Sequence, residues 1–322
     1  MSNDPKDRVI GISISHSPDL GRLGFGEEHL HELMIAIARV LLRLGTSEQP
    51  VHLAYGGDLR PGGFTETLLD LARAESQGGW RGRMYSFLAW PYYLGLSKAD
   101  EALRLDICRF IRVKPADAGL PQHAADTALE SLPEETRSLL TARCISRLRE
   151  VMTEGGGRGF DHEPVPPLAA RVILGGKTGD YTGIMPGLFE EFMLAQEAGL
   201  PIFVAGGFGG AARALADAVL TSAPEPPPIF SLDHQRAHNA GVAALLDQQY
   251  QADVQGEPPQ ARYDRLAKTI AAYRADLDRT GAPVTPNGLD RSENERLMRS
   301  QHVSEITGLI DRGLRRLWLA DH

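Results

Sequence analysis

Two adjacent carboxylates, Glu190 and Glu191, open a helix-like stretch at residues 188–198, between two glycine-rich segments. The first turn of a helix carries backbone N–H groups that no helical carbonyl accepts, and such groups bind phosphate. A carboxylate there would offset the positive charge that develops on a ribose ring as its base departs. Because adjacent helical residues point about 100° apart, we expect one glutamate to face a ligand while the other complements the helix dipole. The alternative is that both glutamates serve the dipole alone.

The segment in front of this helix follows a strand-like run and supplies further candidates for a phosphate site. They are Gly175, Gly176, Lys177, Gly183, Met185, Pro186 and Gly187. Glycine lets the backbone approach a ligand closely, and the lysine would add a positive charge. The plain alternative for the lysine is a solvated loop side chain.

Two other glycine and serine clusters follow predicted strands. Hydroxyls after the first strand are suited to hold phosphate or ribose, or only satisfy the loop's own backbone. These hydroxyls belong to Ser13, Ser15 and Ser17. A later glycine cluster resembles a diphosphate cradle but lacks the full GxGxxG-plus-acid pattern. Its candidates are Gly206, Gly207 and Gly209.

The loop after the second predicted strand carries Gly56, Gly57, Asp58 and Arg60. Asp58 would accept hydrogen bonds from ribose hydroxyls, and Arg60 offers a bidentate fork for phosphate. The alternative is that these two side chains pair with each other across a tight turn. A loop that combines four glycines with an acid and an arginine favours a ligand site.

The elements that must position these residues alternate between strands and helices. Strands are predicted at residues 8–15, 51–55, 84–89, 107–113 and 202–205 and in the run from residue 171, and helices at 27–44, 65–74, 188–198 and 211–220. This alternation predicts an α/β fold, a doubly wound parallel sheet of the Rossmann-like kind. We predict a nucleotide-binding domain at residues 1–222, with an insertion at 116–167. A helical C-terminal extension at 223–322 would pack on it.

The composition narrows the functional classes. A net charge of −8 over 322 residues gives no basic footprint for nucleic acid. The sequence shows no secretory leader and no apolar run long enough for a membrane span, so we predict a cytoplasmic protein. His234 and His238 stand four residues apart, but no third ligand accompanies them, and we predict neither a metal site nor a cofactor. Trp90 and the tyrosines after it are more typical of core than of a base-stacking surface.

Three motifs together, GISISHSPDL, AYGGDLRPGGFT and ILGGKTGDYTGIMPGLFEE, resemble the SLOG superfamily over residues 8–220. This superfamily comprises Rossmann-like domains related to the DNA-processing protein DprA and to LOG, the cytokinin-activating phosphoribohydrolases. The resemblance implies a pocket for nucleotides or nucleotide-derived ligands; some members cleave the base–ribose bond, and others resemble sensors of NAD-derived signals in bacterial defence. The chain departs from the phosphoribohydrolase pattern PGGxGTxxE, because an extra loop separates the glycine pair from the glutamates. The E-x3-A-x3-G-x-P spacing that starts at Glu191 is distantly similar to nucleoside deoxyribosyltransferases.

Three functional hypotheses follow. The favoured one is a sensor or effector that binds a nucleotide or nucleotide derivative of the NAD or ADP-ribose kind. Self-association into a homo-oligomer is an additional expectation. The second is an N-glycosidase or phosphoribohydrolase, a hydrolase in which Glu191 or Glu190 is the catalytic carboxylate. The third is a partner-binding module that uses an apolar face of the C-terminal helices, although that face would more simply cover the chain's own sheet. Its residues are Leu309, Ile310, Leu314, Leu317 and Trp318.

Overall fold

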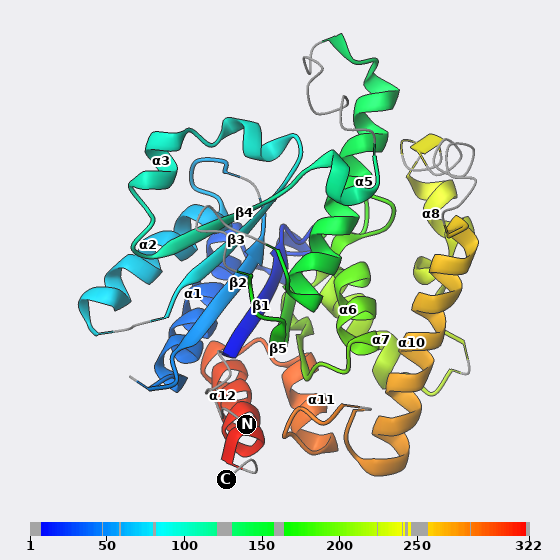
Figure 1. Cartoon of the computed structure of the whole chain (residues 1–322). Helices are drawn as coiled ribbons and strands as arrows, with labels where there is room; N and C mark the ends of the chain where they lie inside the picture. Colours follow the sequence, from blue (N-terminus) through cyan, green and yellow to red (C-terminus); the bar gives the residue numbers. More distant parts are fainter. Residues whose placement is uncertain are drawn as a thin grey trace, which may run out of the picture.

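The part of the chain that the structure, a computed structural model, describes forms one six-stranded parallel sheet (Figure 1). The strand order is β4-β3-β2-β1-β5-β6, and the bounds are β1 Arg8–Ser15, β2 Val51–Gly56, β3 Met84–Ala89, β4 Cys108–Val113, β5 Leu168–Gly175 and β6 Ile202–Ala205. The described residues are 8–46, 48–57, 59–79, 82–120, 131–157, 164–223, 225–239, 241, 244–245, 257–283 and 285–319. The predicted α/β fold with a parallel sheet is confirmed.

The chain winds in opposite directions from the centre of the sheet. β1 to β4 run outward on one side of β1, and β5 and β6 run outward on the other. β1 pairs in register with both neighbours, so that Gly11 lies opposite Ala54 of β2 and Arg171 of β5. The boundary between β1 and β5 is therefore the topological switch point, where open α/β sheets bind their ligands.

Alternate strand residues point to opposite faces, and a layer of helices covers each face (Figure 1). The face to which Ile10, Ile12 and Ile14 point is covered by α1 Glu27–Leu44, α2 Phe64–Gln77 and α12 Val303–Leu319. The opposite face is covered by α5 Glu134–Glu154, α6 Gly187–Glu197 and α7 Gly210–Leu220, and α10 Pro259–Thr280 packs on α6 and α7. The remaining helices are α3 Lys98–Ala102, α8 Leu232–His238 and α11 Arg291–Arg299.

The helix α1 shows how local sequence sets this packing. Its leucines, methionine and isoleucine recur at spacings of three and four, and that stripe is buried against the sheet. Glu27 and Glu28 stand in the first turn, where the helix dipole favours negative charge. The predicted bounds of this helix, and those of the strand Ile202–Ala205, coincide with the structure.

The C-terminal region packs on both faces of the sheet. α10 packs on α6 and α7, and α12 packs on α1. Leu309, Ile310 and Leu314 are buried in the chain's own core, which removes them as the partner-binding face of the third hypothesis. The simpler alternative for these residues, that they cover the chain's own sheet, is what the structure shows. No helix in the described ranges has the length and apolarity that crossing a membrane requires.

Candidate functional site

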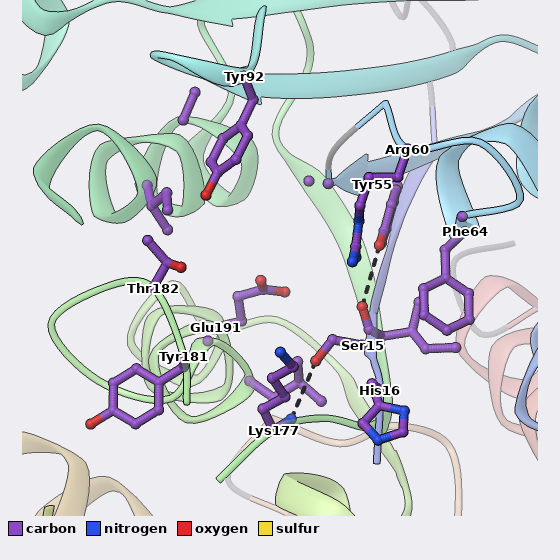
Figure 2. A pocket seen from close by; sticks show the side chains of 18 of the residues that line it. Ser15, His16, Tyr55, Arg60, Phe64, Tyr92, Lys177, Tyr181, Thr182 and Glu191 are labelled. Atoms are coloured by element: carbon purple, nitrogen blue, oxygen red, sulfur yellow. Dashed lines mark hydrogen bonds between the residues drawn. The ribbon is translucent and has the colours of Figure 1, made fainter. Parts of the chain in front are cut away.

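A cavity of about 610 Å³ opens at the carboxyl ends of β1, β2, β3 and β5, across the switch point (Figure 2). Ligand pockets typically have volumes of this order. The starts of three helices, α1, α2 and α6, border the cavity, and one face of α5 forms a further wall. Strands of a parallel sheet end at a common edge, which is why segments more than 100 residues apart in the sequence meet here.

Part of the set of predicted site residues lines this cavity. The lining members are Ser15, Gly56, Gly57, Arg60, Lys177, Gly187 and Glu191. The predicted residues that do not line it are Ser13, Ser17, Gly175, Gly176, Gly183, Met185, Pro186, Glu190, Gly206, Gly207 and Gly209. Asp58 lies outside the described residues. Three of the predicted loops therefore meet at one place, and the loop after β6 does not join them.

Glu191 is the acid that faces the cavity, and the protein holds one of its two carboxylate oxygens. Oε2 accepts hydrogen bonds from the Ser13 hydroxyl and, at 2.6 Å, from Nη1 of Arg171. Oε1 lies 3.6 Å from Nε of Arg149, which is too far for a hydrogen bond. Figure 2 shows the carboxylate in the middle of the cavity. The carboxylate is thus fixed from behind, and its other oxygen lies on the side of a cavity-lining arginine.

Glu190, its neighbour, points away from the cavity and forms a buried ion-pair network. Its Oε1 accepts a hydrogen bond of 2.8 Å from Arg262 of α10, and its Oε2 pairs with Arg149 of α5. Burial alone would raise the pKa of this carboxyl, but the two guanidinium groups outweigh burial and lower it. The two glutamates therefore point in different directions, as expected: Glu191 lines the cavity, whereas Glu190 pairs α6 with α5 and α10.

The turn after β5 joins three elements beside the cavity. Gly175 and Gly176 have φ values of 64° and 97°, in the region that glycine adopts without strain. The N–H of Gly176 donates to the carbonyl of Ser15 and its carbonyl accepts from Ala211, each at 2.9 Å. The N–H of Lys177 donates to the Ser15 hydroxyl at 3.3 Å. This glycine pair therefore places Ser15 and Lys177 side by side at the cavity wall.

The glycine loop after β6 is filled by protein rather than open to a ligand. A Cβ atom on Gly207 would clash with the backbone carbonyl of Ser300, in the connection between α11 and α12. The N–H of Gly210, at the start of α7, donates to the carboxylate of Asp19 at 2.9 Å. A side-chain carboxylate thus occupies the place that a phosphate takes at such a helix start. The glycines allow close backbone packing there.

Arg149 is the most prominent residue of the site that the sequence interpretation missed. It lies on α5, inside the segment treated as an insertion, and it lines the cavity. A Cβ atom on Gly187 would lie 2.6 Å from its Nη2, so the guanidinium rests against the start of α6. No side chain caps that helix start. The helical spacing of Arg149 from Ile145 was the available signal, because it places both on one face of α5.

Several aromatic and titratable side chains complete the wall. The sequence interpretation assigned the aromatic cluster after β3 to the core; Trp90 is buried and Tyr93 packs half-buried against the core, but Tyr92 is exposed and lines the cavity. Tyr181 lines it as well, and its hydroxyl donates to Gln235 of α8 at 3.0 Å. Burial raises the pKa of Tyr181 to about 12. The titratable side chains at the wall that were not anticipated are His16, Glu27, His31 and Asp180.

The described residues include no group of three or more histidine, cysteine, aspartate or glutamate side chains that would hold a metal ion. His234 and His238 stack on each other, with ring centroids 4.0 Å apart, on one face of α8.

The family assignment agrees with this geometry. The model of the family described as SLOG cluster2 matches residues 4–297, so the chain belongs to this SLOG family. The resemblance inferred from the three motifs is therefore confirmed, and the matched range includes α5 and Arg149. No curated protein matches the chain.

Proposed function

We propose that this SLOG cluster2 protein binds a nucleotide or nucleotide derivative of the ADP-ribose or NAD kind at the switch-point cavity. In this proposal it acts as a sensor or effector in bacterial defence or signalling. The observation that carries the proposal is a fixed carboxylate, Glu191, in the middle of a cavity with cationic and aromatic walls. A ligand with phosphate, ribose and base offers one group to each of these features.

The side chains around Glu191 support one orientation of the ligand, in which its phosphate and its base lie on opposite sides of the carboxylate. Figure 2 shows Tyr92 and Tyr181 on one side of the carboxylate and Ser15, His16 and Lys177 on the other. Cations and hydroxyls bind phosphate, whereas aromatic rings stack on bases. We therefore place the phosphate near Ser15 and Lys177 and the base near the tyrosines. The ribose would then lie beside Glu191, whose carboxylate accepts hydrogen bonds from sugar hydroxyls.

The test is a thermal-shift screen of the purified protein with AMP, ADP, ADP-ribose, NAD and cyclic ADP-ribose, followed by chromatography for released base. The proposal expects at least one compound to raise the melting temperature. Lys177→Ala should reduce that rise by removing a phosphate-side charge. Lys268→Ala, on α10 and outside the cavity-lining set, is the matched control and should leave the rise unchanged. If no compound stabilises the protein, the proposed function is wrong.

A second candidate function is hydrolysis of the bond between base and ribose. The observation that favours it is the hold of Ser13 and Arg171 on Oε2 of Glu191, which leaves Oε1 for the reacting sugar. A carboxylate beside the sugar stabilises the oxocarbenium-like centre or attacks it. Hydrolysis predicts free base in the screen with the wild-type protein and none with Glu191→Gln. Binding without any free base leaves the sensor as the function.

A further inference from the structure

Arg171 is an unusual residue for the middle of a parallel sheet. It lies on β5, directly opposite Gly11 of β1, and its side chain is fully buried. A Cβ atom at Gly11 would lie 3.6 Å from Cζ of Arg171, which is ordinary van der Waals contact, and 2.7 Å from the Leu168 side chain, so the guanidinium is packed beside the Gly11 backbone. A buried cation is costly to desolvate, and an apolar residue of similar size would fill the same space without that cost. Packing alone therefore does not explain an arginine here.

Arg171 is connected to the cavity through its hydrogen bond to the Glu191 carboxylate. Nη1 donates to Glu191 Oε2 at 2.6 Å and to the Ser13 hydroxyl at 2.8 Å, and that hydroxyl in turn donates to the same Oε2. Nη2 donates to the Thr153 hydroxyl at 2.8 Å. Of these partners, Glu191 lines the cavity, whereas Ser13 and Thr153 lie behind it.

This geometry limits how Glu191 meets a ligand. Oε2 accepts hydrogen bonds from two protein donors, the Ser13 hydroxyl and Nη1 of Arg171, and these two donors are hydrogen-bonded to each other. Rotation of the carboxylate would break both bonds and leave a buried guanidinium without a charged partner, which is strongly unfavourable. Oε1 is therefore the oxygen that remains for a donor from the cavity, and its direction is fixed before the ligand arrives.

We infer that Arg171 and Ser13 are positioning residues that aim Oε1 of Glu191 at a ribose hydroxyl, so that the site selects ribonucleotide over deoxyribonucleotide ligands. This inference rests on the proposed function and deepens it. A ligand that lacks the hydroxyl leaves this fixed, partly desolvated oxygen without a hydrogen bond, because its ion-pair neighbour, Nε of Arg149, is 3.6 Å away. A hydrogen bond to a charged acceptor corresponds to a preference of at least about tenfold.

The experiment compares dissociation constants for AMP and ADP-ribose with those for their 2′-deoxy and 3′-deoxy forms, measured by calorimetry. The ratio of deoxy to ribo dissociation constants is the readout, because a general loss of structure weakens both forms equally. Ser13→Ala and Thr153→Val form a matched pair of variants. Each removes one hydrogen bond of Arg171, but only Ser13 touches Glu191.

The inference expects a wild-type ratio of at least about ten for one of the hydroxyls. Ser13→Ala and Arg171→Met should bring the ratio toward one, and Thr153→Val should preserve it. In a Glu191→Gln background, Ser13→Ala should lower the ratio no further, since Ser13 acts through that carboxylate. Ser13→Ala carries the test if Arg171→Met does not fold.

Two results overturn the inference and leave the proposed function standing: a ratio near one in the wild-type protein that does bind, or a ratio that Ser13→Ala leaves unchanged. Absence of binding of every probe to the wild-type protein overturns the proposed function and the inference together.

Discussion

Two glycine-rich loops of this protein are similar in sequence and different in use. The loop after β5, with Gly175 and Gly176, leads through Lys177 to the cavity. The loop after β6, with Gly206 and Gly207, has the same place at the end of a parallel strand and before a helix. The helix after the first loop, α6, begins at the cavity wall. The helix after the second loop, α7, begins at the Asp19 carboxylate, which accepts a hydrogen bond from the N–H of Gly210.

The difference shows which glycine loop is left open toward the cavity and which is filled by the protein itself. Both loops begin with a glycine pair after a strand, and glycine allows close approach in both, so this shared feature does not distinguish them. What differs is the partner that approaches: the Arg149 guanidinium beside the start of α6, and the Ser300 backbone with Asp19 at the start of α7. A guanidinium beside a helix start, even one paired with Glu190, does not accept hydrogen bonds from the free N–H groups there, whereas a carboxylate does.

The largest expected effect is a loss of folding stability on substitution in the loop after β6. Gly207→Ala should destabilise the fold by about 3 kcal/mol or more, because its Cβ atom meets the Ser300 backbone and overpacks the connection. Gly308→Ala, on α12 and without neighbours near a new Cβ atom, is the control and should not destabilise. Urea denaturation of both variants measures the effect. Equal stability of the two would mean that the second loop is not packed as described.

The adjacent glutamates differ in the same way as the loops, since Glu191 lines the cavity and Glu190 is paired within the protein. Glu190→Gln should lower the free energy of unfolding by about 3 kcal/mol, because Arg149 and Arg262 lose their buried carboxylate. The lowered pKa of Glu190 means that its contribution is present above the ordinary carboxyl pKa and is lost as the pH falls below it. The stability gap between the wild-type protein and the variant should therefore shrink as the pH falls below the ordinary carboxyl pKa. A gap that widens on acidification contradicts this ion-pair network.

A smaller effect is expected at the carboxylate that fills the second helix start. Asp19→Ala should cost about 1 kcal/mol, as loss of a helix cap does. Thermal unfolding of this variant, with Asp233→Ala as a control, measures the loss. Asp233 is exposed and stands in the first turn of another helix, α8. If phosphate restores the stability of Asp19→Ala alone, the carboxylate does occupy an anion site.

The smallest effect on stability should come from the first loop. Gly187→Ala places its Cβ atom 2.6 Å from Nη2 of Arg149, the end of a flexible side chain that can shift. The melting temperature should stay near that of the wild-type protein, while nucleotide affinity should fall several-fold because the guanidinium moves. A drop in stability as large as that of Gly207→Ala would erase the distinction between the loops.

Sequence periodicity predicted most of the fold because each element carries its own signal. The helix Glu27–Leu44 shows a clear apolar stripe, and the strand Ile202–Ala205 is a buried run between turn signals. The carboxyl-edge loops could be identified as site candidates because the parallel topology alone places them together. The proposed division at residues 222 and 223 remains a prediction.

The parts that could not be predicted depend on tertiary contacts. Arg149 and Glu190 are 41 residues apart, and only the packing of α5 on α6 brings them together. Arg171 lies opposite Gly11 through the register of β1 and β5, and it reaches Glu191 through the packing of α6; no local pattern reveals either arrangement. The glycines Gly206 to Gly210 are predicted as site residues, but the contact that fills their loop is also tertiary. Their composition fits a ligand cradle, and only the position of Ser300 shows the close packing.

A crystal structure of the protein with AMP or ADP-ribose tests the central claim most directly. The account predicts ligand density across the β1–β5 boundary, with phosphate beside Lys177 and Ser15 and a ribose hydroxyl within hydrogen-bond distance of Glu191 Oε1. Ligand density at the glycine loop after β6, with the Asp19 carboxylate displaced, would contradict it.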